Sequence, residues 1–143
     1  MNPKRMDMLP KTLHLVGRIL MGLPYFAFGM AHLLFPDDFI DKQPAFMGGH
    51  LAWVYAFGVV MIALAVSFVT GKLGLYSAFG LAGLLFVLML GIQVPLALSS
   101  DPVVRKEGID QVFKGLGLVG GYLGFAAYFA SQRKLAAIPY SAS

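Results

Sequence analysis

Residues 13–36, LHLVGRILMGLPYFAFGMAHLLFP, decide the fold of this chain. As an α-helix this apolar run spans about 36 Å, at about 1.5 Å per residue, which is long enough to cross a lipid bilayer. Four polar residues interrupt it, and at 3.6 residues per turn they fall within about 40° of one another. They are His14, Arg18, Tyr25 and His32. Because Arg and His are costly next to lipid, we expect this polar stripe to face protein or a cavity.

Arg18 has two interpretations within this stripe. It can anchor the helix by extending its guanidinium to the lipid headgroups, or it can bind a ligand. Every acidic residue lies outside the apolar runs, so Arg18 has no carboxylate at its own depth. Its partners must then be carbonyls, hydroxyls, water, lipid phosphate or a polar ligand. The acids are Asp7, Asp37, Asp38, Asp41, Asp101, Glu107 and Asp110.

The composition places the chain among integral membrane proteins. Its 143 residues suit one domain, and 58% of them are hydrophobic while 13% are charged. A soluble domain of this size has too little interior for so much apolar surface, and continuous apolar runs favour helices over a β-barrel. The net charge of +4 comes without a basic patch of interleaved aromatics, so we expect no nucleic-acid partner. The absence of cysteine excludes disulfides and thiolate chemistry, and no metal site is expected.

Four apolar runs predict an all-α, four-transmembrane-helix bundle. We expect helices at about 13–35, 50–69, 74–98 and 112–130, which together form a membrane domain over residues 13–130. A basic N-terminal tail, 1–12, and a polar C-terminal tail, 131–143, flank this domain, and residues 99–111 form a polar loop. Four spans put both termini on one side of the membrane.

The distribution of charge predicts the orientation of the bundle. The tails and the short turn after the second helix carry six Lys and Arg residues, whereas the opposite side carries four together with six of the seven acids. Positively charged segments stay in the cytoplasm, so both termini are expected there. The sequence thus predicts a multi-pass protein of the cytoplasmic (inner) membrane.

A second set of polar residues lies in the outer third of the predicted spans. His32, Gln93 and Lys114 come from three different helices, and a polar pocket forms if these helices converge. Lys114 and Gln93 also have simpler interpretations, because lysine can extend to the headgroups and glutamine can bond a neighbouring helix. Together with the stripe, the candidate ligand-binding residues are Arg18, Tyr25, His32, Gln93 and Lys114. No catalytic residue is identified.

The last predicted span contains a row of glycines. Gly117, Gly120, Gly121 and Gly124 form two overlapping pairs four residues apart, a spacing typical of closely packed membrane helices. We expect this face to pack against another helix, either within the bundle, which is the simpler interpretation, or in a homo-oligomer.

Four stretches give the chain a resemblance to the DoxX-like family of small four-span bacterial and archaeal membrane proteins. They are GRILMGLPYFAFGMAHLLFP (17–36), WVYAFGVVMIALA (53–65), TGKLG (70–74) and FKGLGLVGGYLG (113–124). The resemblance covers residues 14 to 130. Arg18 and His32 match the polar positions of the family's first helix, and Pro36 matches the proline after its histidine. Some relatives have cysteines, or a histidine in the third helix; here Gln93 stands nearest that histidine, which argues against thiol- or metal-based activity.

The resemblance implies a membrane subunit of a quinone-linked redox complex, with a soluble or membrane redox partner. The ligand would be a quinone or a lipid, held without a covalent bond. Two alternatives stay open: a non-enzymatic membrane scaffold or assembly partner, and a small-solute transporter. The absence of an acidic relay and of inverted repeats weighs against transport. Whether the chain is itself an enzyme is left open by the sequence.

Overall fold

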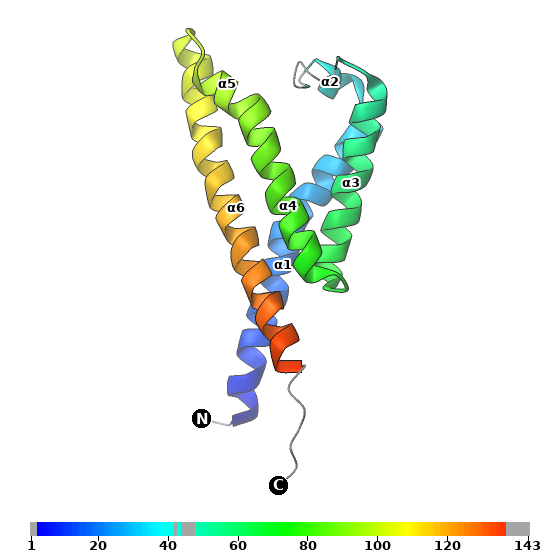
Figure 1. Cartoon of the computed structure of the whole chain (residues 1–143), viewed down its shortest axis with the longest axis vertical. Helices are drawn as coiled ribbons and strands as arrows, with labels where there is room; N and C mark the ends of the chain where they lie inside the picture. The colour runs from blue at the N-terminus through cyan, green and yellow to red at the C-terminus, as the bar shows by residue number, and fades with distance from the viewer. Residues whose placement is uncertain (1–2, 42, 44–47, 137–143) are drawn as a thin grey trace.

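A computed structural model describes residues 3–41, 43 and 48–136, with side chains in these ranges from residue 11 to residue 134. All regular elements of the described ranges are helical (Figure 1). The first half contains α1 (Pro3–Leu34), α2 (Asp37–Ile40) and α3 (Leu51–Thr70). The second half contains α4 (Gly74–Leu88), the π-helical turn η2 (Met89–Gln93), α5 (Val94–Ala97) and α6 (Pro102–Ala136).

The described residues include four helical segments that are long and apolar enough to cross a membrane: Lys11–Leu34, Leu51–Thr70, Gly74–Ala97 and Pro102–Lys134. Large apolar side chains project outward along all four, as on Leu20, Val59, Phe79 and Leu123. Such an apolar surface suits lipid rather than water. The predicted all-α architecture, with four helices long and apolar enough to span a membrane, is therefore confirmed, and it suggests a multi-pass membrane protein.

The helices at the two ends of the chain are longer than the sequence suggested. The first helix begins at Pro3 rather than near residue 13, so the N-terminal tail is largely helical. The last helix begins at Pro102 rather than near residue 112, and it continues to Ala136. Residues 102–111 are therefore helix and not loop, and so are residues 131–136 of the expected C-terminal tail. The rest of that tail, 137–143, lies outside the described residues.

The early start of α6 has a local cause. The backbone N–H of Val103 donates to Oδ1 of Asp101 at 2.8 Å, so Asp101 caps the helix and Pro102 occupies its first position. This Asp-Pro pair lies within the expected polar loop, residues 99–111, and here it begins a helix. The charged residues after Pro102 indicate exposure to water. A helix that extends beyond the bilayer is exposed to water just as a loop is, so these residues are compatible with either.

The third span changes its winding near Pro95. Proline has no N–H to donate to the carbonyl four residues earlier, so the regular ladder of α4 cannot continue past this point. The chain instead forms the wider turn η2 before α5. A π-helical turn inside a helix frequently marks a functional position, and this one places Gln93 at its end.

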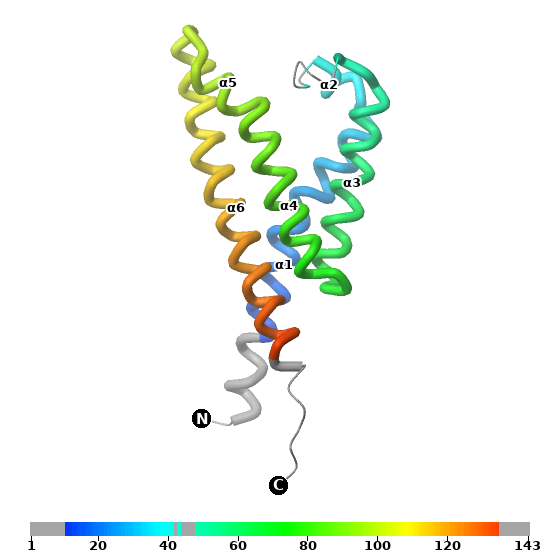
Figure 2. The backbone as a smooth tube through the Cα atoms, in the orientation of Figure 1, coloured from blue at the N-terminus to red at the C-terminus, as the bar shows by residue number. Residues whose placement is uncertain are grey.

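The helices form two arms. The first arm contains α1, α2 and α3, and the second contains α4, η2, α5 and α6 (Figure 2). The arms meet near the turn between α3 and α4 and diverge toward the opposite end (Figure 1). The start of α1 and the end of α6 lie at the meeting end. The core also lies where the arms meet, with Phe68, Leu81 and Tyr122 fully buried at its centre.

Glycines permit the closest approaches within each arm. A Cβ added to Gly58 of α3 would lie 2.9 Å from the carbonyl oxygen of Gly29 in α1. In the second arm, a Cβ on Gly108 of α6 would collide with the backbone of Leu96 and Ala97 in α5. Only residues without a Cβ allow these backbones to come so near.

Candidate functional site

The polar stripe of α1 faces protein, as predicted, but its members lie in different surroundings. Near the meeting end, the ring of His14 stacks on Tyr128 of α6 with 3.7 Å between ring centroids. Phe125 and Phe129 flank the same histidine ring. His14 is therefore part of an aromatic cluster between α1 and α6.

Tyr25 belongs to the core. It is 8% exposed and packs edge-on against Tyr122 of α6, with 5.5 Å between ring centroids. The Tyr122 hydroxyl donates to the backbone carbonyl of Met21 at 2.7 Å. This bond joins α6 to α1 one turn before Pro24. Tyr25 thus has a structural role in joining the two arms.

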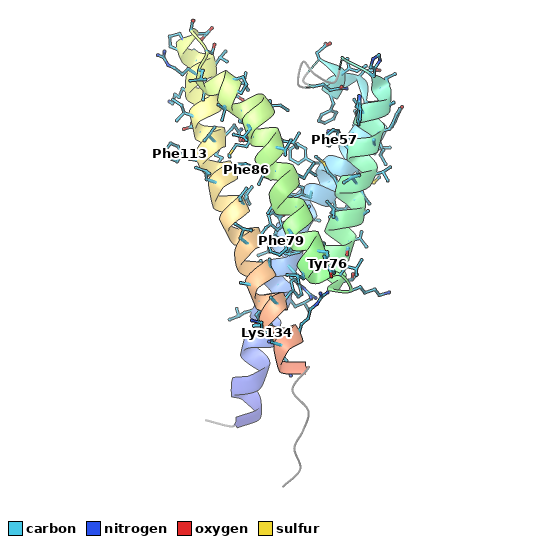
Figure 3. The ribbon with its side chains drawn as sticks, viewed as in Figure 1. Phe57, Tyr76, Phe79, Phe86, Phe113 and Lys134 are labelled. Atoms are coloured by element: carbon cyan, nitrogen blue, oxygen red, sulfur yellow. The ribbon has the colours of Figure 1, made fainter. Side chains whose placement is uncertain are left out.

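A cavity of about 240 Å³ lies between the arms, beyond the core and toward the end where they diverge. Its walls are mostly aromatic and aliphatic, and three polar residues interrupt them. The first arm contributes Phe28, His32, Phe39, Gln43, Val54, Phe57 and Met61, and the second contributes Leu88, Ile92 and Gln93. Figure 3 labels Phe57 on the part of α3 that faces this region. An apolar pocket with a few polar groups is the usual form of a small-molecule site.

His32 is held in a defined orientation at this cavity. Its ring stacks on Phe39 of α2 with 3.9 Å between centroids, and Nδ1 lies 2.8 Å from the Phe28 carbonyl oxygen. A carbonyl only accepts, so Nδ1 must carry the proton. In the neutral ring Nε2 is then an acceptor, and it lies on the opposite edge from the helix backbone. His32 can accordingly accept a hydrogen bond from a hydroxyl group of a ligand.

Gln93 lines the same cavity from the other arm. Its Oε1 is buried and has no hydrogen-bond partner among the described residues, which is costly unless a ligand or water supplies one. Gly115 of α6 lies beside this oxygen, and a Cβ added to Gly115 would be 3.2 Å from Oε1 of Gln93. An amide can donate or accept, so Gln93 suits a carbonyl or a hydroxyl. Among the candidate residues, the structure brings His32 and Gln93 to one cavity.

Lys114 does not join this cavity. It precedes Gly115, which faces Gln93, and consecutive helical residues point about 100° apart. The Lys114 side chain is therefore exposed on α6. The sequence placed it at the right depth but could not specify the side of the helix.

Arg18 lies at the opposite end from the cavity. Its guanidinium lies over the Phe129 ring, 5.8 Å from the centroid, and next to Gly71 at the turn between α3 and α4. Gly71 ends α3 in a left-handed conformation with φ of 76°. A cation is favourable there because carbonyl groups at a helix C-terminus carry partial negative charge. Nε of Arg18 is buried and has no partner among the described residues.

The glycine row of α6 packs within the chain at one position. A Cβ on Gly121 would lie 2.8 Å from the Met21 methyl carbon of α1, whereas Gly117, Gly120 and Gly124 have no atom within 4 Å of such a Cβ in the described structure. The intramolecular contact expected for the whole row is thus limited to Gly121. The other three glycines lie on an uncovered face.

The aromatic wall and Gln43 were not among the predicted site residues. Gln43 donates from Nε2 to the His50 carbonyl at 3.2 Å and leaves Oε1 without a partner in the described ranges. The sequence signal that could have indicated these residues was the apolar character of the segment that follows α1, which contains Phe39 and Ile40. No group of three or more potential metal ligands occurs among the described residues.

Comparison of the chain with family models, curated proteins and solved structures gave no match in any of the three.

Proposed function

We propose that this protein is a DoxX-like membrane subunit of a quinone-linked redox complex, and that the cavity between its arms binds the quinone or quinol ring. The cavity carries the proposal, because its polar groups stand on facing arms and its walls are aromatic. A quinone ring is flat and apolar, with oxygens at opposite edges. The resemblance of residues 17–36 to the DoxX-like family supports the same conclusion.

His32 and Gln93 have separate roles in this proposal. Nε2 of His32 accepts a hydrogen bond from a quinol hydroxyl, since Nδ1 is already bound to the Phe28 carbonyl. The Gln93 amide binds the oxygen at the other edge of the ring. Phe28, Phe39 and Phe57 contact the ring faces.

The electrons in this proposal pass to or from a partner protein. The chain has no cysteine that could carry them as a thiol. We place the protein in the cytoplasmic membrane with both termini in the cytoplasm. The basic residues near both ends of the chain support this orientation.

Photolabelling in lipid nanodiscs tests this function. An azido-quinone with a short tail should label peptides from α1 and from the segment 88–93, and excess unlabelled quinol should compete. Gln93→Leu and His32→Ala should each weaken competition by about threefold to tenfold, the effect of losing one hydrogen bond. The matched controls are Gln132→Leu and His50→Ala, which alter exposed residues outside the cavity. Equal labelling of variants and controls would exclude the cavity as the quinone site.

A scaffold function has one observation in its favour, the uncovered glycine face of α6. Another helix can approach closely at Gly120 and Gly124, because nothing in the described chain lies near them. Gly120→Leu should then abolish association without unfolding the protein, while Gly83→Leu on the open side of α4 should not. Unchanged association of Gly120→Leu in crosslinking experiments would remove this alternative.

A further inference from the structure

A second hollow lies on the outside of the first arm, separate from the cavity between the arms. It is a groove of about 220 Å³ between α1 and α3. Its lining is apolar apart from Thr70, whose hydroxyl already donates to the Val66 carbonyl at 2.8 Å. The groove therefore offers no free hydrogen-bonding side chain and suits hydrocarbon. The lining residues are Ile19, Gly22, Leu23, Phe26, Ala65, Val66, Val69 and Thr70.

Arg18 stands at one end of this groove. On α1 it lies one turn before Gly22, and on α3 its guanidinium lies beside Gly71, the residue after Thr70. From this end the groove continues along both helices toward Phe26, which is toward the middle of the predicted span. The cation thus lies next to the end of the apolar groove, as the phosphate of a phospholipid lies next to the end of its acyl chain.

The charge around Arg18 also favours an anion. Lys11, Lys72, Arg133 and Lys134 lie near the same end of the described structure. The six acidic residues with described side chains lie in α2 or directly after it, before α6, and in the first turns of α6. Asp7 precedes the described side chains, and its backbone is about 16 Å from Arg18 along α1. Lys134 and Tyr76 are both labelled near this end in Figure 3.

We propose that this groove is a specific site for an anionic phospholipid, with one acyl chain between α1 and α3 and the phosphate on the Arg18 guanidinium. Guanidinium binds phosphate oxygens through two parallel hydrogen bonds, a geometry that the ammonium group of lysine lacks. A free phosphate ion would leave the apolar groove unfilled, so the lipid is the occupant that accounts for both halves of the site. This site is independent of the quinone proposal, because it shares no residue with the cavity.

Native mass spectrometry of the delipidated full chain tests this proposal. The protein is mixed with dioleoyl-phosphatidylglycerol or dioleoyl-phosphatidylcholine, which have the same acyl chains but different net charge. We expect one phosphatidylglycerol per chain to survive activation that removes phosphatidylcholine, and its apparent affinity to be at least tenfold higher. Equal retention of the two lipids would overturn the proposal and leave Arg18 as an unselective anchor.

Variants separate the two halves of the site. Arg18→Gln should reduce phosphatidylglycerol retention to the level of phosphatidylcholine, and Arg18→Lys should restore it only partly. Lys106→Gln removes an exposed cation at the opposite end of the described structure and should change nothing. Val66→Trp fills the groove from its exposed wall and should reduce retention, while Val59→Trp alters an exposed position outside the groove. Loss of selectivity in Lys106→Gln, or full retention in Val66→Trp, would contradict the site.

Two further measurements keep these outcomes distinct. Thermal unfolding of each variant, followed by circular dichroism, identifies any variant whose lipid retention falls because the protein is not folded. Arg18→Lys and Val66→Trp alter partly exposed positions, so we expect both variants to remain folded. Inorganic phosphate at millimolar concentration should not displace the lipid. Complete displacement by phosphate would instead indicate a simple anion site at Arg18 and would refute the role of the groove.

Discussion

Substituting alanine for Gly58 should separate α1 from α3. The added Cβ would lie 2.9 Å from the Gly29 carbonyl oxygen and 2.9 Å from Cβ of His32, whereas ordinary contacts begin at 3.4 Å. The helices must therefore move apart by about 0.5 Å, and a gap of that size forfeits at least about a quarter of the dispersion energy of each affected contact. Overpacking of this kind typically costs about 1–3 kcal/mol, and we expect Gly58→Ala to destabilise the protein by that amount.

The assay is reversible unfolding by sodium dodecyl sulfate in mixed micelles, followed by far-ultraviolet circular dichroism. Gly83→Ala is the matched control, because a Cβ on Gly83 meets nothing within 4 Å. That variant should be as stable as the parent or slightly more so, since alanine favours a helix by up to about 1 kcal/mol over glycine. If Gly58→Ala unfolds at the same detergent fraction as Gly83→Ala, the close contact between α1 and α3 does not contribute as argued.

Three further substitutions test the packing by the same unfolding assay. Tyr122→Phe removes the hydroxyl bond to the α1 backbone and should cost about 1 kcal/mol, and an unchanged midpoint would refute that bond. Phe68→Ala empties a fully buried position and should cost about 3–5 kcal/mol, while Phe79→Ala, at 54% exposure, should change stability by less than about 0.5 kcal/mol; similar losses for both would place the core elsewhere. Gly108→Ala should cost about 3 kcal/mol or more because its Cβ meets the α5 backbone, and tolerance of this change would mean that α5 and α6 are not in contact.

The sequence predicted the fold class and the four spans because both follow from the length and composition of apolar runs. It misplaced the start of the last helix because charged residues such as Arg105 and Asp110 were taken to indicate a loop. Polarity reports contact with water, and a helix that extends beyond the bilayer also meets water. The Asp101 cap is a local signal that the composition of the surrounding segment concealed.

The candidate site was predicted in part for a related reason. The spacing of seven along α1 correctly placed the polar stripe on the side that faces protein. Periodicity shows which side of a helix a residue faces, but it does not bring residues together along the helix axis. His14 and His32 are about 27 Å apart along α1. The stripe therefore reaches both ends of the molecule, and Arg18 and His32 lie in different environments. The divergence of the two arms depends on packing between distant segments, which a single sequence does not encode in a readable pattern.

The placement of Arg18 and His32 explains how one helix can contain two unlike polar groups. Arg18 lies at the turn between α3 and α4, where a cation can reach headgroups and is least costly. His32 lies at the diverging end, where its ring stacks on Phe39 and its Nδ1 bonds the Phe28 carbonyl of its own helix. These two contacts hold the ring in place without an ion pair. Between Arg18 and His32 along α1, Tyr25 packs against Tyr122 in the core. Because the Tyr122 hydroxyl bonds the α1 backbone, this core holds together the two arms whose side chains, His32 and Gln93 among them, form the walls of the cavity.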